Sequence, residues 1–222
     1  MRGRFITFEG GEGTGKSTHS ILLSDRLEAL GIDVVLTREP GGSPGAEVIR
    51  HVLLSGVAKP LGVKAEALLF AAARDDHVRT TIEPALARGA CVICDRFIDS
   101  TRVYQGALGN LDPNLISALE RVTVGELRPD LTFILDVPAE IGLARALKRR
   151  GEGAADRFEA ESRIFHEALR DAYRRLATDE PGRCLLIDAT EPKVAVAERI
   201  WKSVGERLDP ANAPAQRAGA AS

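Results

Sequence analysis

Near the N-terminus, a short glycine-rich segment constrains the fold more than any other feature of this chain. The segment GGEGTGKST, residues 10–18, follows an apolar run at residues 5–8 and precedes a helical pattern that begins at Lys16. It fits G-x-x-x-x-G-K-[ST], in which glycines let consecutive backbone N–H groups surround phosphate oxygens at the start of a helix. The flanking strand and helix are the context that this motif requires. The sequence therefore predicts a nucleoside triphosphate site at the end of the first strand.

The polar side chains of this loop have specific predicted tasks. Lys16 is expected to reach the β- and γ-phosphates, and the Ser17 hydroxyl is expected to bind Mg²⁺. The predicted triphosphate contacts are Gly10, Gly11, Glu12, Gly13, Thr14, Gly15, Lys16, Ser17 and Thr18. The alternative is a flexible glycine turn that binds nothing, and the flanking strand and helix argue against it.

Short apolar runs alternate with helical patterns along the rest of the chain. Predicted strands cover residues 5–8, 33–37, 91–94, 131–137 and 183–187. Predicted helices cover residues 16–30, 46–54, 64–88, 113–126, 139–149, 159–178 and 193–208. This alternation predicts an α/β fold, with a five-stranded parallel sheet flanked by helices on both faces. Ligands of such sheets bind at the C-terminal edge of the strands.

The length and composition favour one globular domain. With 222 residues, 44% of them hydrophobic, the chain can build a sizeable core, and we expect one domain over residues 1–208. The segment GEGAAD predicts a mobile loop within a short lid at about residues 148–158. Residues 209–222 contain Pro, Ala and Gly without apolar periodicity, so a disordered tail is expected there.

Charge and apolar runs argue against several kinds of partner. Lys and Arg total 30 against 32 Asp and Glu, and a net charge of −2 does not favour a nucleic-acid or membrane surface. No apolar run approaches the roughly 18 residues of a membrane span or forms a signal peptide, so a cytoplasmic protein is expected. Cys91 and Cys94 would face opposite sides of a strand, which predicts core residues rather than a metal or disulfide pair.

Two common classes of nucleotide-binding protein do not fit the sequence. A GTPase would need N-K-x-D to read guanine, and no asparagine in this chain is followed by lysine. A motor or remodelling ATPase would have an apolar strand ending in Asp-Glu, where the Glu polarises water. The two predicted strands that end in Asp read CVICDR and LTFILDV, without that Glu. Water is therefore not the predicted phosphoryl acceptor.

Arginines lie where a second, anionic substrate would bind. Arg38 follows the second predicted strand, Arg96 follows the third, and Arg74 lies in the helical stretch FAAARDD. Arginine contacts phosphate in a bidentate manner, so together these residues could hold a dianionic acceptor. A single arginine at a strand end is usually a solvated charge, but two at one sheet edge favour a ligand site. Asp95 is expected to hold Mg²⁺ or orient the attacking phosphate oxygen, with a structural carboxylate as the alternative.

Basic residues cluster where the predicted lid begins. They are Arg145, Lys148, Arg149, Arg150 and Arg157, against two acidic residues, Glu152 and Asp156. Cations at a helix C-terminus often serve only as favourable dipole partners on a solvated face, which is one interpretation. Closing over a γ-phosphate, the same cluster would neutralise the charge in transfer and exclude water.

Six segments of the chain together carry a family pattern. They are FITFEGGEGTGKST, TREPGG, EALLFAAARDDH, VICDRFIDSTRVYQG, RPDLTFILDV and the DRFE after the lid. In this order and spacing, the sequence resembles thymidylate kinases of the bacterial type over about residues 3–208. The resemblance implies a P-loop kinase fold, a homodimer, and transfer of the γ-phosphoryl of Mg-ATP to dTMP, giving dTDP.

The resemblance also implies how dTMP is held. Phe70 would stack on thymine and Arg74 would donate to its exocyclic oxygen, although spacing alone favours a plain core aromatic for Phe70. Thr101 and Gln105 would lie near the base edge, and Tyr104 would crowd the sugar 2′ position. The implied contacts to dTMP are Glu12, Arg38, Phe70, Arg74, Arg96, Ser100, Thr101, Tyr104 and Gln105.

The acceptor phosphate and the catalytic charge involve a further group of residues. By the same resemblance, Arg38 and Arg96 would clamp the acceptor phosphate, and Glu12 would contact the 3′-hydroxyl or help to position the acceptor. The phosphate loop contains no basic residue before Lys16, so the lid must supply the catalytic arginine, and Arg145 is implied near the adenine. The implied catalytic residues are Lys16, Asp95, Arg96, Arg149 and Arg150.

Some alternatives remain open on the sequence. A kinase for another acceptor, such as UMP or a deoxynucleoside, is the nearest rival, although a deoxynucleoside kinase would use a carboxylate base rather than paired arginines. A regulator that senses ATP without transferring phosphate is the rival of another class, and it has no need of a basic lid beside an acceptor clamp. The helix predicted at residues 113–126 has an apolar stripe that fits either a dimer contact or its own sheet.

Overall fold

The predicted α/β sheet is present in the protein, which we describe from a computed structural model covering residues 2–151 and 158–208. In this part of the chain, five parallel strands form one sheet in the order β2-β3-β1-β4-β5. The strands are β1 (Phe5–Glu9), β2 (Val34–Arg38), β3 (Cys91–Asp95), β4 (Leu131–Asp136) and β5 (Cys184–Asp188). Each lies within one residue of its predicted bounds. The three central strands, β1, β3 and β4, are almost entirely buried, and strands covered on both faces are nearly continuous apolar runs.

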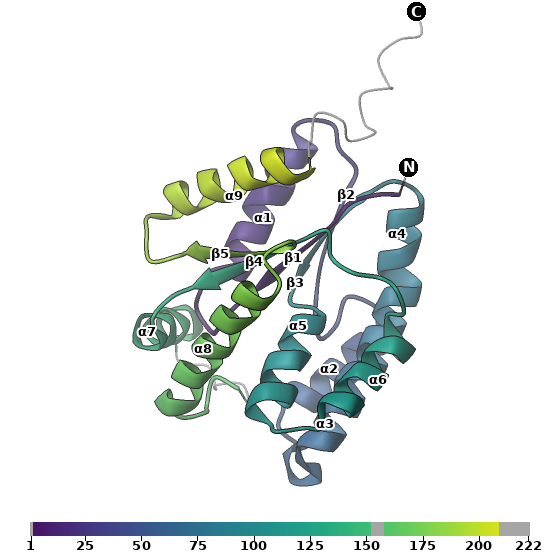
Figure 1. Ribbon diagram of the computed structural model, residues 1–222, viewed down its shortest axis with the longest axis vertical. Coiled ribbons are helices and arrows are strands. Elements are labelled where there is room, and N and C mark those ends of the chain that lie inside the picture. The colour runs from purple at the N-terminus through teal and green to yellow at the C-terminus, as the bar shows by residue number, and fades with distance from the viewer. Residues whose placement is uncertain (1, 152–157, 209–222) are drawn as a thin grey trace, which may run out of the picture.

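Helices cover both faces of the sheet (Figure 1). The α-helices are α1 (Lys16–Glu28), α2 (Pro44–Leu54), α3 (Gly62–His77), α4 (Glu83–Ala87), α5 (Ile98–Thr101), α6 (Pro113–Thr123), α7 (Ala139–Arg150), α8 (Arg163–Asp179) and α9 (Lys193–Leu208). The shorter helical segments are η1 (Lys59–Leu61), η2 (Val78–Ile82) and η3 (Arg102–Leu108), and the last two are π-helical. Helices α1 and α9 pack on one face of the sheet, and α4, α5 and α8 pack on the other.

Three helical regions differ from the prediction. The helix predicted for residues 159–178 begins four residues later, as α8 at Arg163, because the Ser162 side chain caps its N-terminus by accepting from the backbone N–H of Phe165. The single helix predicted for residues 64–88 is divided into α3, η2 and α4, because the backbone widens into a π-helical turn at η2. The helical segment formed by α5 and η3 was not predicted at all. Its sequence, IDSTRVYQGAL, has polar residues on more than one face, so the apolar spacing of an amphipathic helix is absent.

The central strand β1 carries the phosphate loop into the middle of the molecule. Each of its residues is buried, and it pairs with β3 on one side and β4 on the other. Gly13 in the following loop has a φ of 65°, and a Cβ there would lie 1.9 Å from the carbonyl oxygen of Gly142 in α7. The loop can therefore approach α7 this closely only with glycine at this position.

The two cysteines that are close in sequence face opposite sides of the sheet, as predicted. Cys91 packs in the core cluster under α1 and α9, whereas Cys94 packs in the cluster under α4 and α5. Both are buried and free, as is Cys184. They serve as small core residues.

Parts of two predicted features lie outside the described residues. The lid prediction covers residues 152–157, which are not described, and the tail prediction at residues 209–222 falls entirely outside. Within the described ranges, none of the helices has both the length and the apolar character needed to cross a membrane.

Candidate active site

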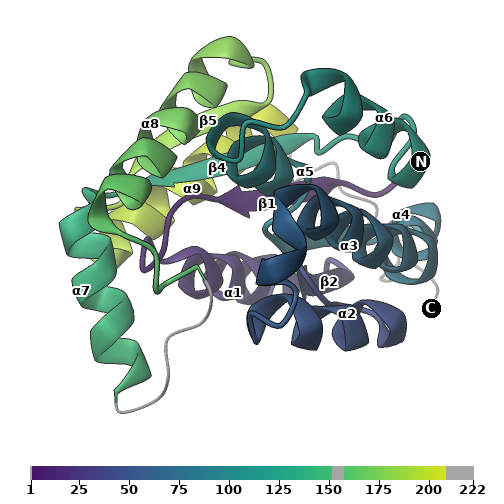
Figure 2. The same ribbon diagram turned by 90° about the horizontal axis from the view of Figure 1, so that it is seen from below.

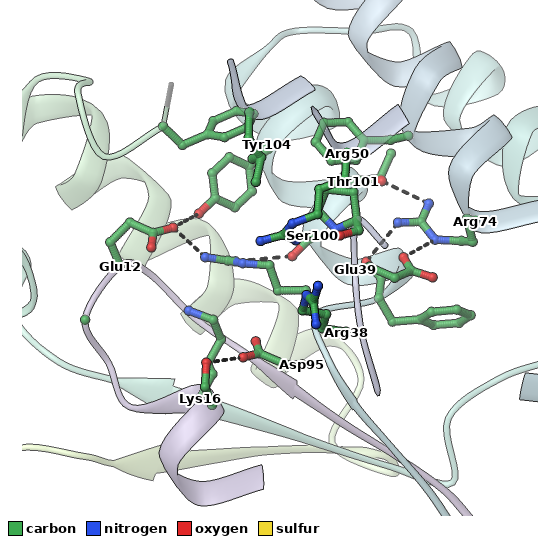
Figure 3. Close-up of a pocket in the computed structure, with 18 of the residues that line it drawn as sticks. Glu12, Lys16, Arg38, Glu39, Arg50, Arg74, Asp95, Ser100, Thr101 and Tyr104 are labelled. Atoms are coloured by element: carbon green, nitrogen blue, oxygen red, sulfur yellow. Dashed lines mark hydrogen bonds and ion pairs between the residues drawn. The ribbon is translucent and has the colours of Figure 1, made fainter. Parts of the chain in front are cut away.

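The C-terminal ends of β1, β2 and β3 bring the predicted residues to one place. In the sheet register, Asp95 at the end of β3 pairs with Phe8 in β1 and with Arg38 in β2. A cavity of about 300 Å³ opens above these strand ends (Figure 3). The predicted residues that line it are Glu12, Gly13, Gly15, Lys16, Ser17, Thr18, Arg38, Phe70, Arg74, Asp95, Arg96, Ser100, Thr101, Tyr104, Gln105 and Arg149.

The remaining predicted residues lie beside this cavity rather than in it. Gly10, Gly11 and Thr14 line a smaller neighbouring cavity under α7 and α8. Arg145 donates to the carbonyl oxygen of Ala189, just after β5, at 2.9 Å. Arg150 contacts Glu159 at 3.1 Å. The predicted donor side of the site therefore extends from the phosphate loop toward α7 and the end of β5.

Lys16 lies directly over the phosphate loop. Its Nζ donates to the carbonyl oxygens of Gly11 at 2.7 Å and Gly10 at 3.2 Å. Burial, together with the positive charge of Arg96, lowers the pKa of Lys16 to about 8. The ammonium is thus held by backbone acceptors inside the loop, at the place where the motif puts the lysine that contacts phosphate.

Two oxygen donors meet beside this lysine. The Ser17 hydroxyl donates to Asp95 Oδ2 at 2.5 Å, joining the start of α1 to the end of β3. Hydroxyl and carboxylate oxygens are the donors that Mg²⁺ prefers. Among the residues that the structure describes, no group of three or more His, Cys, Asp and Glu side chains forms a metal site. Mg²⁺ usually keeps several waters and binds substrate phosphates, so it needs only one or two side-chain ligands from the protein. Ser17 and Asp95 therefore fit this ion.

Arg96 connects the phosphate loop to the predicted acceptor side of the cavity. Its backbone adopts a left-handed φ of 71°. Its Nη1 donates to the carbonyl oxygen of Gly10 at 3.0 Å, and its Nη2 donates to Glu12 Oε1 at 2.6 Å. Burial acts to raise the pKa of Glu12, but the charges of Arg96, Lys16 and Arg149 outweigh it and lower that pKa to about 2. Glu12 is therefore an anion enclosed by cations.

Sequence reasoning missed a buried carboxylate beneath this arginine. Glu9, the last residue of β1, accepts from the backbone N–H groups of Phe97 at 2.8 Å and Ser100 at 3.2 Å. It also accepts from the hydroxyls of Ser100 at 2.7 Å and Tyr173 at 2.9 Å. Burial, with a smaller effect of the Asp99 charge, raises the pKa of Glu9 to about 7. An acidic residue ending an apolar strand was the only signal for it, because its partners come from distant segments.

Tyr173 and Arg50 were also missed. Tyr173, on α8, is fully buried, and its hydroxyl contacts Arg96 at 3.3 Å as well as Glu9. Arg50, on α2, lines the cavity and donates to the carbonyl oxygen of Pro40 at 2.5 Å. Tyr173 occurs in an ordinary amphipathic pattern and Arg50 on a polar helix face, so neither had a signal in the sequence that distinguished it from a structural residue.

The predicted base side of the cavity contains a fixed arginine and a half-buried aromatic ring. Arg74 is 4% exposed and donates to Thr101 Oγ1 at 3.0 Å. Phe70 is half-buried on the same helix and lines the cavity with Gln105. The Tyr104 hydroxyl, between this side and the phosphate loop, donates to Glu12 Oε1 at 3.3 Å. Figure 3 shows Arg74 at one end of the cavity and Lys16 and Glu12 at the other.

Together, the fold and this cavity define a class of protein. A phosphate loop on the central strand, an oxygen pair suited to Mg²⁺ and a second, arginine-lined compartment are the site of a P-loop nucleoside monophosphate kinase. The protein-family model described as thymidylate kinase matches residues 8–200. The chain therefore belongs to the thymidylate kinase family.

Curated relatives and a solved structure agree with this assignment. A thymidylate kinase of Bradyrhizobium diazoefficiens is 63% identical over 209 residues, which are 94% of this chain and 92% of that protein. One of Nitrobacter winogradskyi is 62% identical over 213 residues, 96% of this chain and 93% of that protein. The crystal structure of thymidylate kinase from Ehrlichia chaffeensis superposes with a TM-score of 0.72 and 36% identity, covering 92% of this chain and 99% of that one. The chain is thus a phosphotransferase whose reaction is the ATP-dependent phosphorylation of dTMP to dTDP.

Proposed function

We propose that the cavity above the strand ends holds dTMP and the γ-phosphoryl end of Mg-ATP together, so that transfer takes place inside it. One observation carries this proposal. Lys16 and Ser17 of the phosphate loop line the same 300 Å³ cavity as Phe70, Arg74 and Arg96 of the acceptor side. Holding donor and acceptor in line within one cavity supplies most of what phosphoryl transfer needs from a protein.

The acceptor base occupies the end of the cavity that Arg74 and Phe70 line. Thymine stacks on the Phe70 ring, and Arg74, already held by Thr101, donates to the exocyclic oxygen. Thr101 and Gln105 lie along the base edge. Tyr104 stands between base and phosphate sides, where it crowds a 2′-hydroxyl and disfavours ribonucleotides.

The acceptor phosphate lies between the arginines. Arg38 and Arg96 clamp it, with Ser100 beside Arg96 at 3.3 Å. Glu12, joined to Arg96, contacts the 3′-hydroxyl or helps to position the acceptor. A nucleoside monophosphate is already largely deprotonated at neutral pH, so the acceptor oxygen needs no strong general base.

On the donor side, the phosphate loop binds the triphosphate and Arg145 lies toward the adenine. Ser17 and Asp95 would hold Mg²⁺, which supplies charge neutralisation at the phosphate oxygens when it is bound. Lys16 neutralises the charge that develops in transfer, and Arg149 or Arg150 adds the positive charge of the lid. The lid also excludes water, which would otherwise compete as acceptor.

We also propose a cytoplasmic homodimer. Large apolar side chains are exposed on three neighbouring helices, at Val48 in α2, Leu68 in α3 and Val122 in α6. Figure 2 shows these helices packed side by side, with α3 between α2 and α6. A second copy of the chain would cover this face. Sedimentation of Val48→Glu/Val122→Glu should show a monomer while Val194→Glu, on α9, stays dimeric, and dimers from both variants would place the contact elsewhere.

The experiment that tests the function is ADP release from Mg-ATP with each acceptor supplied separately. The acceptors are dTMP, dUMP, UMP, CMP, AMP and GMP. We expect strong turnover with dTMP, weaker turnover with dUMP and negligible turnover with the others, because only these two combine an exocyclic oxygen with a 2′-deoxy sugar. Equal turnover with UMP would contradict the role of Tyr104. No turnover with any acceptor would leave only a nucleotide-binding module.

A further inference from the structure

Two buried residues next to Arg74 have no place among the proposed substrate contacts, although the first of them, Glu39, lines the cavity. Glu39 follows β2 in the segment TREPGG, and His77 ends α3 in the segment RDDH. Glu39 is 6% exposed and His77 is fully buried. A buried carboxylate and a buried imidazole each cost free energy unless their polar atoms are paired. Their partners therefore indicate what the two residues do.

Arg74 is held on three of its sides. Its Nε donates to Glu39 Oε2 at 2.8 Å, Nη1 donates to Thr101 Oγ1 at 3.0 Å, and Nη2 donates to the carbonyl oxygen of Phe97 at 3.2 Å. A guanidinium has five N–H groups, so one on each terminal nitrogen is not used by these bonds. The ion pair with Glu39 sets the plane of the group, and thereby the direction of those terminal N–H groups.

Glu39 is itself fixed from behind by His77. The other carboxylate oxygen, Oε1, lies 3.1 Å from His77 Nδ1, and because a carboxylate oxygen only accepts, Nδ1–H is the donor. The second ring nitrogen, Nε2, lies 2.8 Å from the Thr37 hydroxyl in β2. A Cβ on Gly42 would lie 2.3 Å from Thr37 Oγ1 and 2.4 Å from His77 Nε2, so glycine here lets the backbone enclose this bond. The bonds form a continuous chain from Thr37 through His77 and Glu39 to Arg74.

We propose that His77 is a positioning residue for base selection. Held by Thr37, it fixes the Glu39 carboxylate, which orients Arg74 toward the exocyclic group of the bound pyrimidine. Because arginine only donates, this orientation accepts a base with an oxygen there and rejects one with an amino group, such as cytosine. The inference rests on the proposed function, in which Arg74 contacts the base.

The test compares dTMP and dCMP, by steady-state kinetics and by isothermal titration calorimetry on the full-length enzyme. In His77→Leu, which keeps an apolar side chain of similar size but no donor, we expect KM and Kd for dTMP to rise about 10-fold. The KM for ATP should stay within about two-fold, and the preference for dTMP over dCMP should fall about 10-fold. His77→Asn, whose amide N–H can replace Nδ1–H, should restore most of the preference. Equal losses for dTMP and dCMP, or no loss, would overturn the proposal.

A second pair of variants covers the case in which His77→Leu does not fold. Thr37→Val removes the hydroxyl but keeps a β-branched side chain at a half-buried strand position, and it should reduce the preference about three-fold. Thr81→Val is the matched control, because its hydroxyl donates to the Gly42 carbonyl oxygen at 2.9 Å in the same neighbourhood but outside the chain of bonds. An effect of Thr81→Val as large as that of Thr37→Val would indicate general loosening and would overturn the proposal.

A variant of Arg74 separates this inference from the proposed function. Arg74→Met should abolish the preference for dTMP over dCMP, and adding His77→Leu to it should change the preference no further, since His77 acts through Arg74. If Arg74→Met keeps the preference, the proposed base contact itself is wrong. If Arg74→Met loses the preference while His77→Leu and Thr37→Val both keep it, only the positioning role is wrong.

Discussion

Glu12 Oε1 and Arg96 Nη2 lie 2.6 Å apart, although 84 residues separate them in the sequence. This pair joins the phosphate loop to the segment after β3 that we propose to clamp the acceptor. Both side chains are largely buried, so the bond is a charge-assisted one in a poorly solvated place. It offers the most direct way to test whether the two halves of the cavity depend on each other.

Replacing Glu12 by Gln should lower kcat/KM for dTMP about 10- to 100-fold, because a hydrogen bond between charged groups contributes about 1.5–3 kcal/mol. Steady-state kinetics with dTMP as the varied substrate measures this effect. Glu198→Gln, which removes the exposed pair with Arg26, is the matched control and should change little. Equal kinetics in the two variants would mean that Arg96 keeps its place without Glu12.

Replacing Lys16 by Ala should lower kcat by about 100- to 1,000-fold, the usual effect of removing one donor that stabilises transition-state charge. ADP release measures turnover, and circular dichroism with thermal unfolding shows whether the variant is folded. Lys202→Ala, at an exposed lysine of α9, provides the comparison. A folded Lys16→Ala enzyme with full turnover would remove this residue from the mechanism.

Replacing Ser17 by Ala should raise the Mg²⁺ concentration needed for half-maximal turnover about 10-fold, because one of the two protein oxygens that meet beside Lys16 is lost. Titration of Mg²⁺ at fixed ATP gives this value, and Ser17→Thr, which keeps a hydroxyl, should remain close to the original enzyme. Chelation of Mg²⁺ should abolish turnover of the original enzyme. An unchanged Mg²⁺ titration in Ser17→Ala would show that the hydroxyl does not bind the ion.

Replacing Arg149 should lower kcat more than replacing Arg150. Both contact Glu159, Arg149 at 2.9 Å and Arg150 at 3.1 Å. Of the two, only Arg149 lines the cavity, and its charge acts on Glu12. We expect Arg149→Ala to lower kcat about 100-fold and Arg150→Ala to lower it only a few-fold. Single-turnover measurements separate the chemical step from product release. The reverse order of effects would assign the catalytic role to Arg150.

Glu9 should make stability depend on pH. Its pKa is raised from 4.5 to about 7 in the folded protein, so folding favours the protonated form. The stability that it contributes is complete below about pH 4.5 and is lost as the pH rises through about 7. Relative to the original protein, Glu9→Gln should therefore gain about 1–3 kcal/mol in free energy of unfolding between pH 5 and pH 7.5.

Urea unfolding at these two pH values measures that difference, and exposed Glu206 on α9 supplies the matched Glu→Gln control. The Gln side chain also loses one acceptor, but that loss is the same at both pH values and cancels in the comparison. A difference between Glu9→Gln and the original protein that does not change with pH would contradict the raised pKa.

Much of this molecule follows from local patterns in the chain. The strands are within one residue of their predicted bounds. The three central strands are buried on both faces, which requires nearly continuous apolar runs, and strand ends in a parallel sheet meet at one edge. The phosphate loop is equally local, since its glycines, lysine and hydroxyl are consecutive residues. Because strand ends in a parallel sheet meet at one edge, Arg38 at the end of β2 and Arg96 after β3 could be assigned to one cavity from their positions alone.

What only the tertiary structure decided depends on partners that are distant in sequence. In the sequence, Glu9 is indistinguishable from an ordinary polar residue at the end of a strand. In the structure, the backbone after β3 and the Tyr173 hydroxyl of α8 donate to its carboxylate. Likewise, the sequence indicates only that His77 lies near the end of a helix. The structure pairs its two ring nitrogens with Thr37 and Glu39, which belong to another segment.

The segment α5–η3 was not predicted because its polar residues Ser100, Thr101 and Gln105 line the cavity instead of forming an exposed polar face. Periodicity reports which face of an element is apolar, whereas the pairing of buried polar groups is determined only when distant elements pack together.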